Sequence, residues 1–219
     1  MTIALLLIDM QNDYFPGGNM ELEGSLKASL RARELLALFR EKNLPVVHIQ
    51  HVATRPGAAF FLPDTEGVKI HANVEPRPGE VIFQKNYPNS FRGTPLLDYL
   101  RDNKIASIVV GGMMTHMCVD ATVRAAFDYG LEVTVVHDAC ATRDQEFEGA
   151  VVPAAQVHAA FMAALKSSKY FTSVELKKTA AVTKNAFRIV DFTITAAVNY
   201  VPPAVVAATP KPALPGAAR

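Results

Sequence analysis

The sequence predicts an α/β fold, a three-layer α/β/α sandwich in which helices cover both faces of a parallel sheet. Short apolar runs alternate along the chain with amphipathic runs of helical spacing, and this alternation is typical of parallel βαβ units. The strand-like runs are apolar at successive positions, as in strands that are buried on both faces. With 219 residues, the chain is long enough for one such domain with a sizeable core.

The individual elements follow from these patterns. The predicted strands are residues 3–8, 45–50, 81–83, 105–111 and 133–137, and the predicted helices are 25–42, 95–103, 119–129 and 151–167. The first helix has a Leu/Ala face, and the third keeps apolar side chains at helical spacing up to Phe127. Gly130 is placed to cap the third helix, and Pro153 to open the last one. The longest irregular stretch is 52–79.

The composition indicates an ordinary soluble globular protein. Half of the residues are hydrophobic, a fifth are charged, and the formal net charge is +1. Without a basic stripe or an acidic tail, nucleic acid and anionic membranes are not expected partners. The N-terminal apolar run has no basic leader and is too short for a signal or a membrane span. Cys118 and Cys140 form no disulfide framework, so a cytoplasmic location is expected.

Three polar residues follow directly on predicted strands, where parallel sheets build their sites. They are Asp9, Lys85 and Cys118. One charge after a strand is often only the chain reaching solvent, but a base, a cation and a nucleophile at one edge form a more specific set. Cys118 also lies where a strand turns into a helix, and unpaired N–H groups and the helix dipole there favour a thiolate. We therefore expect Cys118 to be a nucleophile.

Three segments carry a family resemblance. Residues 7–13 read Leu-Ile-Asp-Met-Gln-Asn-Asp, residues 84–91 read Gln-Lys-Asn-Tyr-Pro-Asn-Ser-Phe, and residues 112–119 read Gly-Met-Met-Thr-His-Met-Cys-Val. In this order they resemble the isochorismatase-like cysteine hydrolases, which include nicotinamidases and N-carbamoylsarcosine amidases. The resemblance implies a Rossmann-like, six-stranded parallel sheet in a hydrolase domain at 1–178, and a homo-oligomer, either dimer or tetramer.

The resemblance also implies roles for the polar residues. Cys118 would attack a carbonyl carbon, Asp9 would take its proton and pass it to the leaving amine, and Lys85 would hold both in register. Water would then cleave the thioester. Help of this kind is needed because only a few per cent of an unperturbed thiol is ionised at neutral pH. The backbone N–H groups of Met114 and Cys118 would form the oxyanion hole, beside a non-proline cis peptide at Met113–Met114.

The expected substrate is a small molecule with a C–N bond in an amide, ureide or lactam. Isochorismatases proper cleave a vinyl ether and lack the nucleophilic cysteine, so the thiol favours the amide-type reaction. Candidate substrate-binding residues are aromatic side chains near the expected site, each of which could instead be core, and the histidine beside the nucleophile: Phe15, Phe60, Phe61, Tyr87, Phe91 and His116.

No metal ion and no other cofactor is expected. Nicotinamidase-like members place an Asp and several His residues after the second strand, but residues 47–52 here read Val-His-Ile-Gln-His-Val, without that Asp. His48, His51 and His71 could bind Zn²⁺ only if they converged. A metal-dependent nicotinamidase-like or isochorismatase-like hydrolase is therefore the alternative function.

Two further alternatives belong to other classes. A non-catalytic binding paralogue is disfavoured because the base, the cation and the nucleophile are all present. A nucleotide-binding oxidoreductase is disfavoured because no glycine-rich phosphate turn follows the first strand. The C-terminal extension, 179–219, has no counterpart in the resemblance. It combines a strand-like piece with a proline-rich piece, and is either a dispensable appendage or an arm that reaches a neighbouring subunit.

Overall fold

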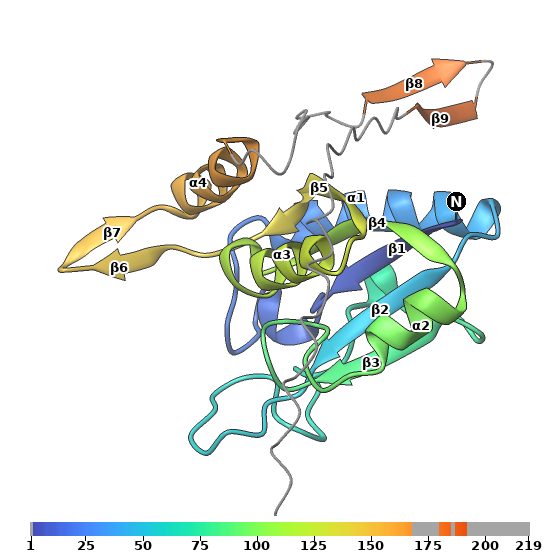
Figure 1. Cartoon of the computed structure of the whole chain (residues 1–219). Helices are drawn as coiled ribbons and strands as arrows, with labels where there is room; N and C mark the ends of the chain where they lie inside the picture. The colour runs from blue at the N-terminus through green and yellow to red at the C-terminus, as the bar shows by residue number, and fades with distance from the viewer. Residues whose placement is uncertain (1, 168–179, 185–186, 192–219) are drawn as a thin grey trace, which may run out of the picture.

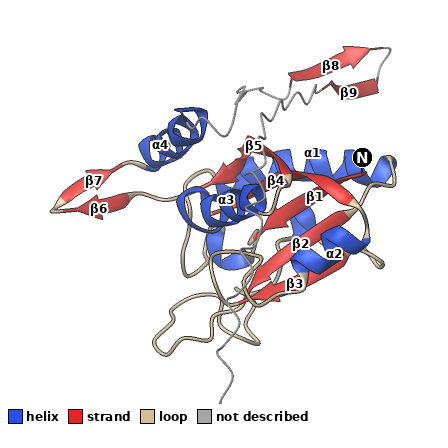
Figure 2. Cartoon of the chain, viewed as in Figure 1, coloured by secondary structure: helices blue, strands red, loops and turns tan. Residues whose placement is uncertain are grey.

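A computed structural model describes residues 2–167, 180–184 and 187–191. Five strands form one parallel sheet in the order β3-β2-β1-β4-β5 (Figure 1). These strands are β1 (Thr2–Ile8), β2 (Val46–His51), β3 (Val81–Lys85), β4 (Ile105–Met113) and β5 (Glu132–Ala141). The helices are α1 (Ser25–Glu41), α2 (Leu96–Asp102), α3 (Asp120–Asp128) and α4 (Ala154–Ser167), coloured blue in Figure 2. The predicted α/β class is confirmed.

The central strand β1 shows why the sheet has helices on both faces. Ala4, Leu6 and Ile8 pack into a core cluster with side chains of α2, α3 and α4. Leu5 and Leu7 point the other way and pack with side chains of α1. Each of the five is at most 2% exposed, and burial of such an aliphatic side chain stabilises the fold by roughly 1.5–3 kcal/mol. Two apolar cores therefore fix the register of β1.

The carboxyl ends of β1 and β4 lie side by side, at the point where successive strands begin to be added on the other side of β1. Along the chain, β1, β2 and β3 extend the sheet to one side, and β4 then pairs with the other edge of β1. At this pairing Gly112 lies opposite Ile8, so close that a Cβ on Gly112 would lie 2.4 Å from the Ile8 carbonyl oxygen. Glycine is thus required for β4 to approach β1 just before the expected nucleophile.

Two predictions about the elements need correction. The sheet has five strands among the described residues, not six, because no further strand there pairs with β5; residues 168–179, which follow α4, lie outside the described part. The last helix begins at Ala154 and not at 151, because Val151 and Val152 belong to a hairpin strand that ends before Pro153. The cap at Gly130 is confirmed: its φ is +81°, and its N–H donates to the Phe127 carbonyl at 2.8 Å.

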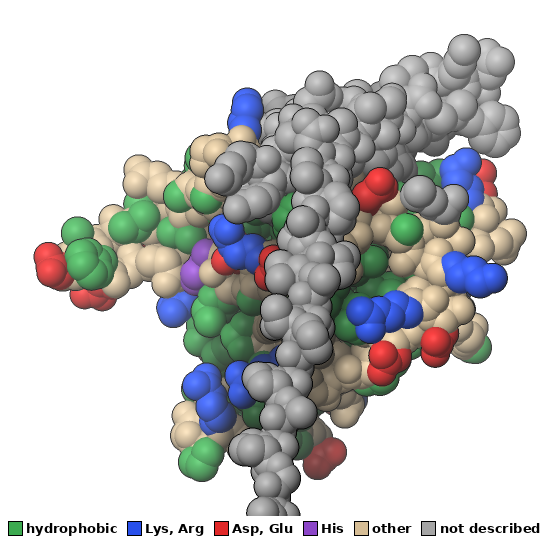
Figure 3. Space-filling view, viewed as in Figure 1, with side chains coloured by type: hydrophobic (Ala, Val, Ile, Leu, Met, Phe, Trp, Pro, Cys, Tyr) green, Lys and Arg blue, Asp and Glu red, His purple; other side chains and the backbone are tan. Residues whose placement is uncertain are grey.

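Two small antiparallel sheets lie outside the main one. Strands β6 (Gln145–Phe147) and β7 (Ala150–Val152) form a hairpin that projects from the body of the molecule. Hydrophobic and acidic side chains gather at its end in Figure 3, where Phe147 is 70% exposed. Strands β8 (Ala180–Lys184) and β9 (Phe187–Asp191) form the second sheet. The predicted boundary at residue 178 and most of the extension lie outside the described residues.

Across the described ranges, none of the helices is both long enough and apolar enough to cross a membrane.

Candidate active site

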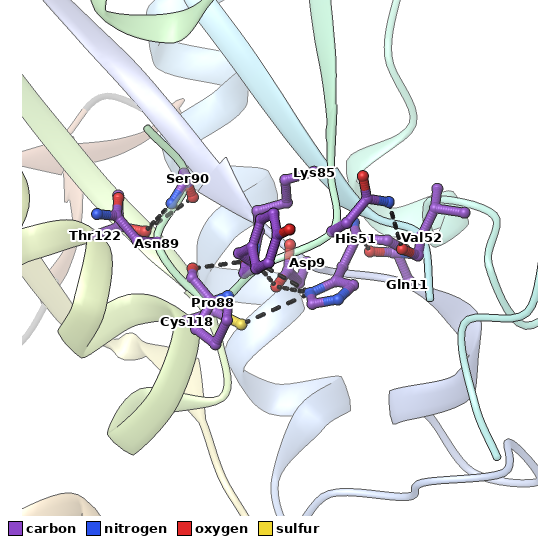
Figure 4. Close-up of polar contacts among 12 residues, drawn as sticks. Asp9, Gln11, His51, Val52, Lys85, Pro88, Asn89, Ser90, Cys118 and Thr122 are labelled. Atoms are coloured by element: carbon purple, nitrogen blue, oxygen red, sulfur yellow. Dashed lines mark hydrogen bonds and ion pairs between the residues drawn. The ribbon is translucent and has the colours of Figure 1, made fainter. Parts of the chain in front are cut away.

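The structure brings the three polar residues predicted at the strand ends into contact (Figure 4). Asp9 directly follows β1, Lys85 is the last residue of β3, and Cys118 lies in the turn after β4. The Lys85 ammonium nitrogen is 2.8 Å from Asp9 Oδ2, and both side chains are fully buried. Asp9 and Cys118 also contribute to one group of atoms that all lie within 4.8 Å of one another. A carboxylate, an ammonium and a thiol thus form one buried cluster at the carboxyl ends of the strands.

The local backbone explains how β1 and β4 present these side chains. Asp9 has a positive φ of +51°, an uncommon conformation for a residue with a side chain, and its N–H donates to the Ile49 carbonyl at 3.0 Å. Cys118 lies in a π-helical turn, Thr115–Val119, that precedes α3. The Met113–Met114 peptide before this turn is cis, as the resemblance implied. Cys118 therefore lies in this π-turn and not in the first turn of an α-helix.

Lys85 is held by groups from the segment that follows it. Its Nζ donates to the carbonyl oxygens of Tyr87 and Pro88, each at 3.1 Å. This segment is tied to α3, because the Ser90 N–H donates to Thr122 Oγ1 at 3.1 Å and the two hydroxyls are 2.8 Å apart. The ammonium is thus fixed from two sides, by two carbonyls and by the Asp9 carboxylate.

His51 is a fourth member of this cluster. The sequence analysis considered it as a possible metal ligand and did not select it as a site residue. It ends β2 and is the register partner of Lys85. Its Nδ1 lies 3.4 Å from Lys85 Nζ, 3.8 Å from Asp9 Oδ2 and 4.0 Å from Cys118 Sγ. The signal was available in the sequence, since the polar residue at the end of β2 obeys the same strand-end rule that identified Asp9 and Lys85.

Electrostatics stabilise the Asp9–Lys85 ion pair. Burial alone would raise the pKa of Asp9, but the Lys85 ammonium and His51 outweigh burial and hold that pKa below its ordinary value. Burial would lower the pKa of Lys85, but the Asp9 carboxylate, with a further contribution from Cys118, raises it above its ordinary value. Each charge therefore depends on its partner, as expected for ions that have lost their hydration.

The pKa of Cys118 corrects the prediction that its position favours a thiolate. Cys118 is 4% exposed, and burial raises the pKa of its thiol well above the ordinary value; Asp9 raises it further, and Lys85 only partly opposes this. The partial charge at a helix N-terminus is small compared with the cost of burying an anion beside a carboxylate. The resting side chain of Cys118 is therefore a neutral thiol.

The arrangement does not fit a metal ion. His48 instead contacts Glu80 at 3.1 Å, and the His71 ring stacks on Phe15 at a centroid distance of 3.6 Å, so the three histidines of the metal alternative do not converge. Asp9, His51 and Cys118 could present ligand atoms together, but the Lys85 ammonium already contacts the first two. A second cation among them would be repelled at this short distance.

Aromatic side chains lie along one side of the cluster. The Phe61 ring is 5.9 Å from the His51 ring and 5.0 Å from that of Phe60. Tyr14, which the sequence analysis did not select, packs on Phe61 at 4.5 Å. Burial raises the pKa of the Tyr14 hydroxyl, and the neighbouring Cys118 and Asp9 raise it further. These rings give the site an apolar wall with a neutral phenol.

The remaining predicted substrate-binding residues have varied surroundings. Phe91 is buried and packs on Tyr129, with ring centroids 5.1 Å apart. Tyr87 is 42% exposed beneath the guanidinium of Arg92, and only its carbonyl contacts Lys85. His116 is half-buried, its Nδ1 lies 2.6 Å from the hydroxyl oxygen of Thr142, and burial lowers its pKa. Phe15 is buried against His71 and faces the core.

Comparison with known proteins agrees with this fold. The family model described as an isochorismatase domain matches residues 3–166. The isochorismatase family protein YddQ of Bacillus subtilis is 50% identical over 165 residues, which cover 75% of this chain and 92% of YddQ. A crystal structure of a putative isochorismatase hydrolase from Oleispira antarctica has 53% identity and a TM-score of 0.72, covering 75% of this chain and 89% of that one. A more distant relative, maleamate amidohydrolase of Pseudomonas putida, is 29% identical, covering 65% of this chain and 74% of that enzyme.

Proposed function

The chain belongs to the isochorismatase family of hydrolases, and we propose that it cleaves a C–N bond of a small amide, ureide or lactam through a thioester on Cys118. The observation that carries this proposal is the buried contact of a neutral thiol, an ionised carboxylate and an ammonium. Relatives named for amide substrates, such as maleamate amidohydrolase, support the same bond type.

In the first half-reaction, the Cys118 sulfur attacks the substrate carbonyl carbon while the thiol proton moves to the Asp9 carboxylate. The low pKa of Asp9 keeps it ionised at neutral pH and ready to accept that proton. As the C–N bond breaks, Asp9 returns the proton to the leaving nitrogen. Lys85 stabilises the charge of Asp9 before the transfer and that of the thiolate during it. The products are an amine and a thioester.

In the second half-reaction, water adds to the thioester and the C–S bond breaks, which releases a carboxylic acid and restores the thiol. Both tetrahedral intermediates carry an oxyanion. We assign its stabilisation to the backbone N–H groups of Met114 and Cys118, which lie at either end of the cis-peptide turn. One such donor typically contributes about 10²–10³-fold in rate.

The proposal requires neither a metal ion nor another cofactor, because protein groups supply the base, the nucleophile and the positive charge. We also propose that Phe60, Phe61 and Tyr14 contact the apolar part of the substrate, since their rings line the cluster beside His51. Within this proposal, the enzyme acts as a cytoplasmic homo-oligomer on a small molecule.

The test is a pair of cysteine variants assayed against a panel of small amides, ureides and lactams. Cys118→Ala should lose at least about 10⁴-fold in kcat/KM, and intact mass should show an acyl adduct on the wild type but not on this variant. Cys140→Ala is the matched control, because Cys140 is also buried and its Sγ donates to the Val136 carbonyl. Strong residual turnover in Cys118→Ala would exclude the covalent mechanism.

A further inference from the structure

His51 is the polar group of the site that reaches solvent. Its side chain is 19% exposed, whereas those of Asp9 and Lys85 are 0% exposed and Cys118 is 4% exposed. Once an acyl group occupies Cys118, the hydrolytic water has to approach from the open side of the cluster. His51 Nδ1 lies 4.0 Å from the sulfur that would bear the acyl group.

The contact with Lys85 favours one tautomer of the His51 imidazole. An ammonium only donates, so the tautomer compatible with the 3.4 Å contact between Lys85 Nζ and His51 Nδ1 has a lone pair on Nδ1 and a hydrogen on Nε2. Lys85 has three hydrogens but four nearby acceptors: Asp9 Oδ2 at 2.8 Å, the Tyr87 and Pro88 carbonyls at 3.1 Å, and His51 at 3.4 Å. His51 is the most distant of these acceptors, so its contact with Lys85 is the weakest and its lone pair can accept from another donor.

Gln11 fixes His51 in this position. The Gln11 side chain accepts a hydrogen bond from the backbone N–H of His51 at 2.7 Å. It donates to the backbone carbonyls of His51 at 2.9 Å and of Val68 at 2.7 Å. Gln11 is fully buried, so these three bonds are protected from water. This clamp holds the end of β2, and therefore the imidazole, at a set distance from Cys118.

We propose that His51 is a catalytic residue, the base that activates the hydrolytic water in the second half-reaction. Water oxygen bonds to the thioester carbon while its proton moves to His51 Nδ1. The C–S bond then breaks, the acid leaves, and the imidazolium returns the proton to the Cys118 sulfur. Asp9 serves the first half-reaction and His51 the second, so the two proton transfers use different bases. This inference rests on the proposed function, since it requires an acylated Cys118.

The experiment uses p-nitrophenyl acetate, an activated ester that acylates a reactive thiol with release of p-nitrophenol. The initial burst measures acylation of Cys118, and the steady state measures hydrolysis of the acetyl thioester. His51→Asn keeps a hydrogen-bond acceptor near the position of Nδ1 but cannot take a proton. His71→Asn is the matched control, the same substitution at a histidine that stacks on Phe15 outside the cluster.

We expect His51→Asn to keep a burst rate within about threefold of wild type and to lose about 10²-fold in the steady state, with acetylated Cys118 accumulating by mass. The His71→Asn control should match wild type in both phases. Equal losses of rate in the burst and in the steady state would assign His51 only a structural role. An unchanged steady-state rate would show that His51 takes no part in the second half-reaction. Either outcome overturns this inference but leaves the thioester mechanism standing. If the wild type forms no acylated Cys118, the proposed function and this inference are overturned together.

Discussion

Strand β2 contributes one histidine to each of two polar clusters, and the two clusters differ in how completely their hydrogen bonds are satisfied. His48 and His51 are three positions apart, so they point to opposite faces of the sheet. His48 joins Glu80 and Arg40, whereas His51 joins the candidate site. Both clusters combine a histidine, a carboxylate and a cation near the same strand.

Glu80 has a full set of partners. It accepts from Arg40 Nε at 2.6 Å and Nη2 at 2.8 Å, from the Arg77 N–H at 2.9 Å, and contacts His48 Nε2 at 3.1 Å. Asp9, in contrast, accepts no hydrogen bond of ordinary geometry from the described residues; its ion pair with Lys85 is its short polar contact. In the first cluster, the carboxylate oxygens of Glu80 are occupied by contacts that stabilise the fold. In the second, the carboxylate oxygens of Asp9 can still accept a proton and a hydrogen bond from a substrate.

The strongest test of this difference removes one carboxylate charge at a time. Asp9→Asn should lower kcat/KM by about 10³–10⁴-fold, because the thiol proton of Cys118 then has no carboxylate to accept it. Glu80→Gln, the same chemical change in the other cluster, should leave kcat/KM within about twofold of wild type. Steady-state kinetics on an amide identified from the panel measure both. Comparable activity losses in the two variants would erase the functional distinction between the clusters.

The next largest effect is on stability. Lys85→Met should lower the free energy of unfolding by about 3–5 kcal/mol, because it leaves a fully buried Asp9 carboxylate without its counter-charge. Urea unfolding of Lys85→Met, Asp9→Asn and the double variant forms a double-mutant cycle. The double variant should be more stable than Lys85→Met alone, since it buries no unpaired charge. Strictly additive losses would show that the two groups do not depend on each other.

The sequence predicts those features of the molecule that depend on local patterns of residues. Strand ends are visible in the apolar pattern, and the strand-end rule located Asp9, Lys85 and Cys118. The same rule applied to β2 would have located His51, but this histidine was considered together with His48 as a possible metal ligand. The π-turn before α3 and the β6–β7 hairpin were missed, because one extra residue in a turn and a three-residue strand leave no clear periodicity.

Burial could not be judged from the sequence. The prediction of a thiolate at Cys118 used the helix dipole, a local property, but the thiol lies 4% exposed beside a carboxylate brought from another strand. The aromatic residues illustrate the same limit: Phe61 lies beside His51, while Phe91 packs against Tyr129. Whether a ring faces a pocket or a core depends on tertiary contacts that no spacing encodes.

The smallest expected effect is the contribution of Glu80 to stability in acid. Its pKa is lowered from 4.5 to about 2, since hydrogen bonds from Arg40, Arg77 and His48 outweigh the opposing effect of burial. Between these pH values the unfolded chain binds more protons at this site than the folded one, so stability falls as pH falls. The contribution is complete above about pH 4.5 and lost as pH approaches 2.

Glu80→Gln removes the charge but keeps an acceptor, so it should be less stable than wild type by about 1–2 kcal/mol at neutral pH. Because Gln does not titrate, this difference should shrink through the same acid range and vanish near the pKa of the folded carboxyl. Thermal unfolding of both proteins from neutral pH downward measures it, with kcat/KM at neutral pH recorded in parallel. A difference that stayed constant with pH would show that Glu80 acts through shape and not through charge, and the contrast with Asp9 would then lie in packing.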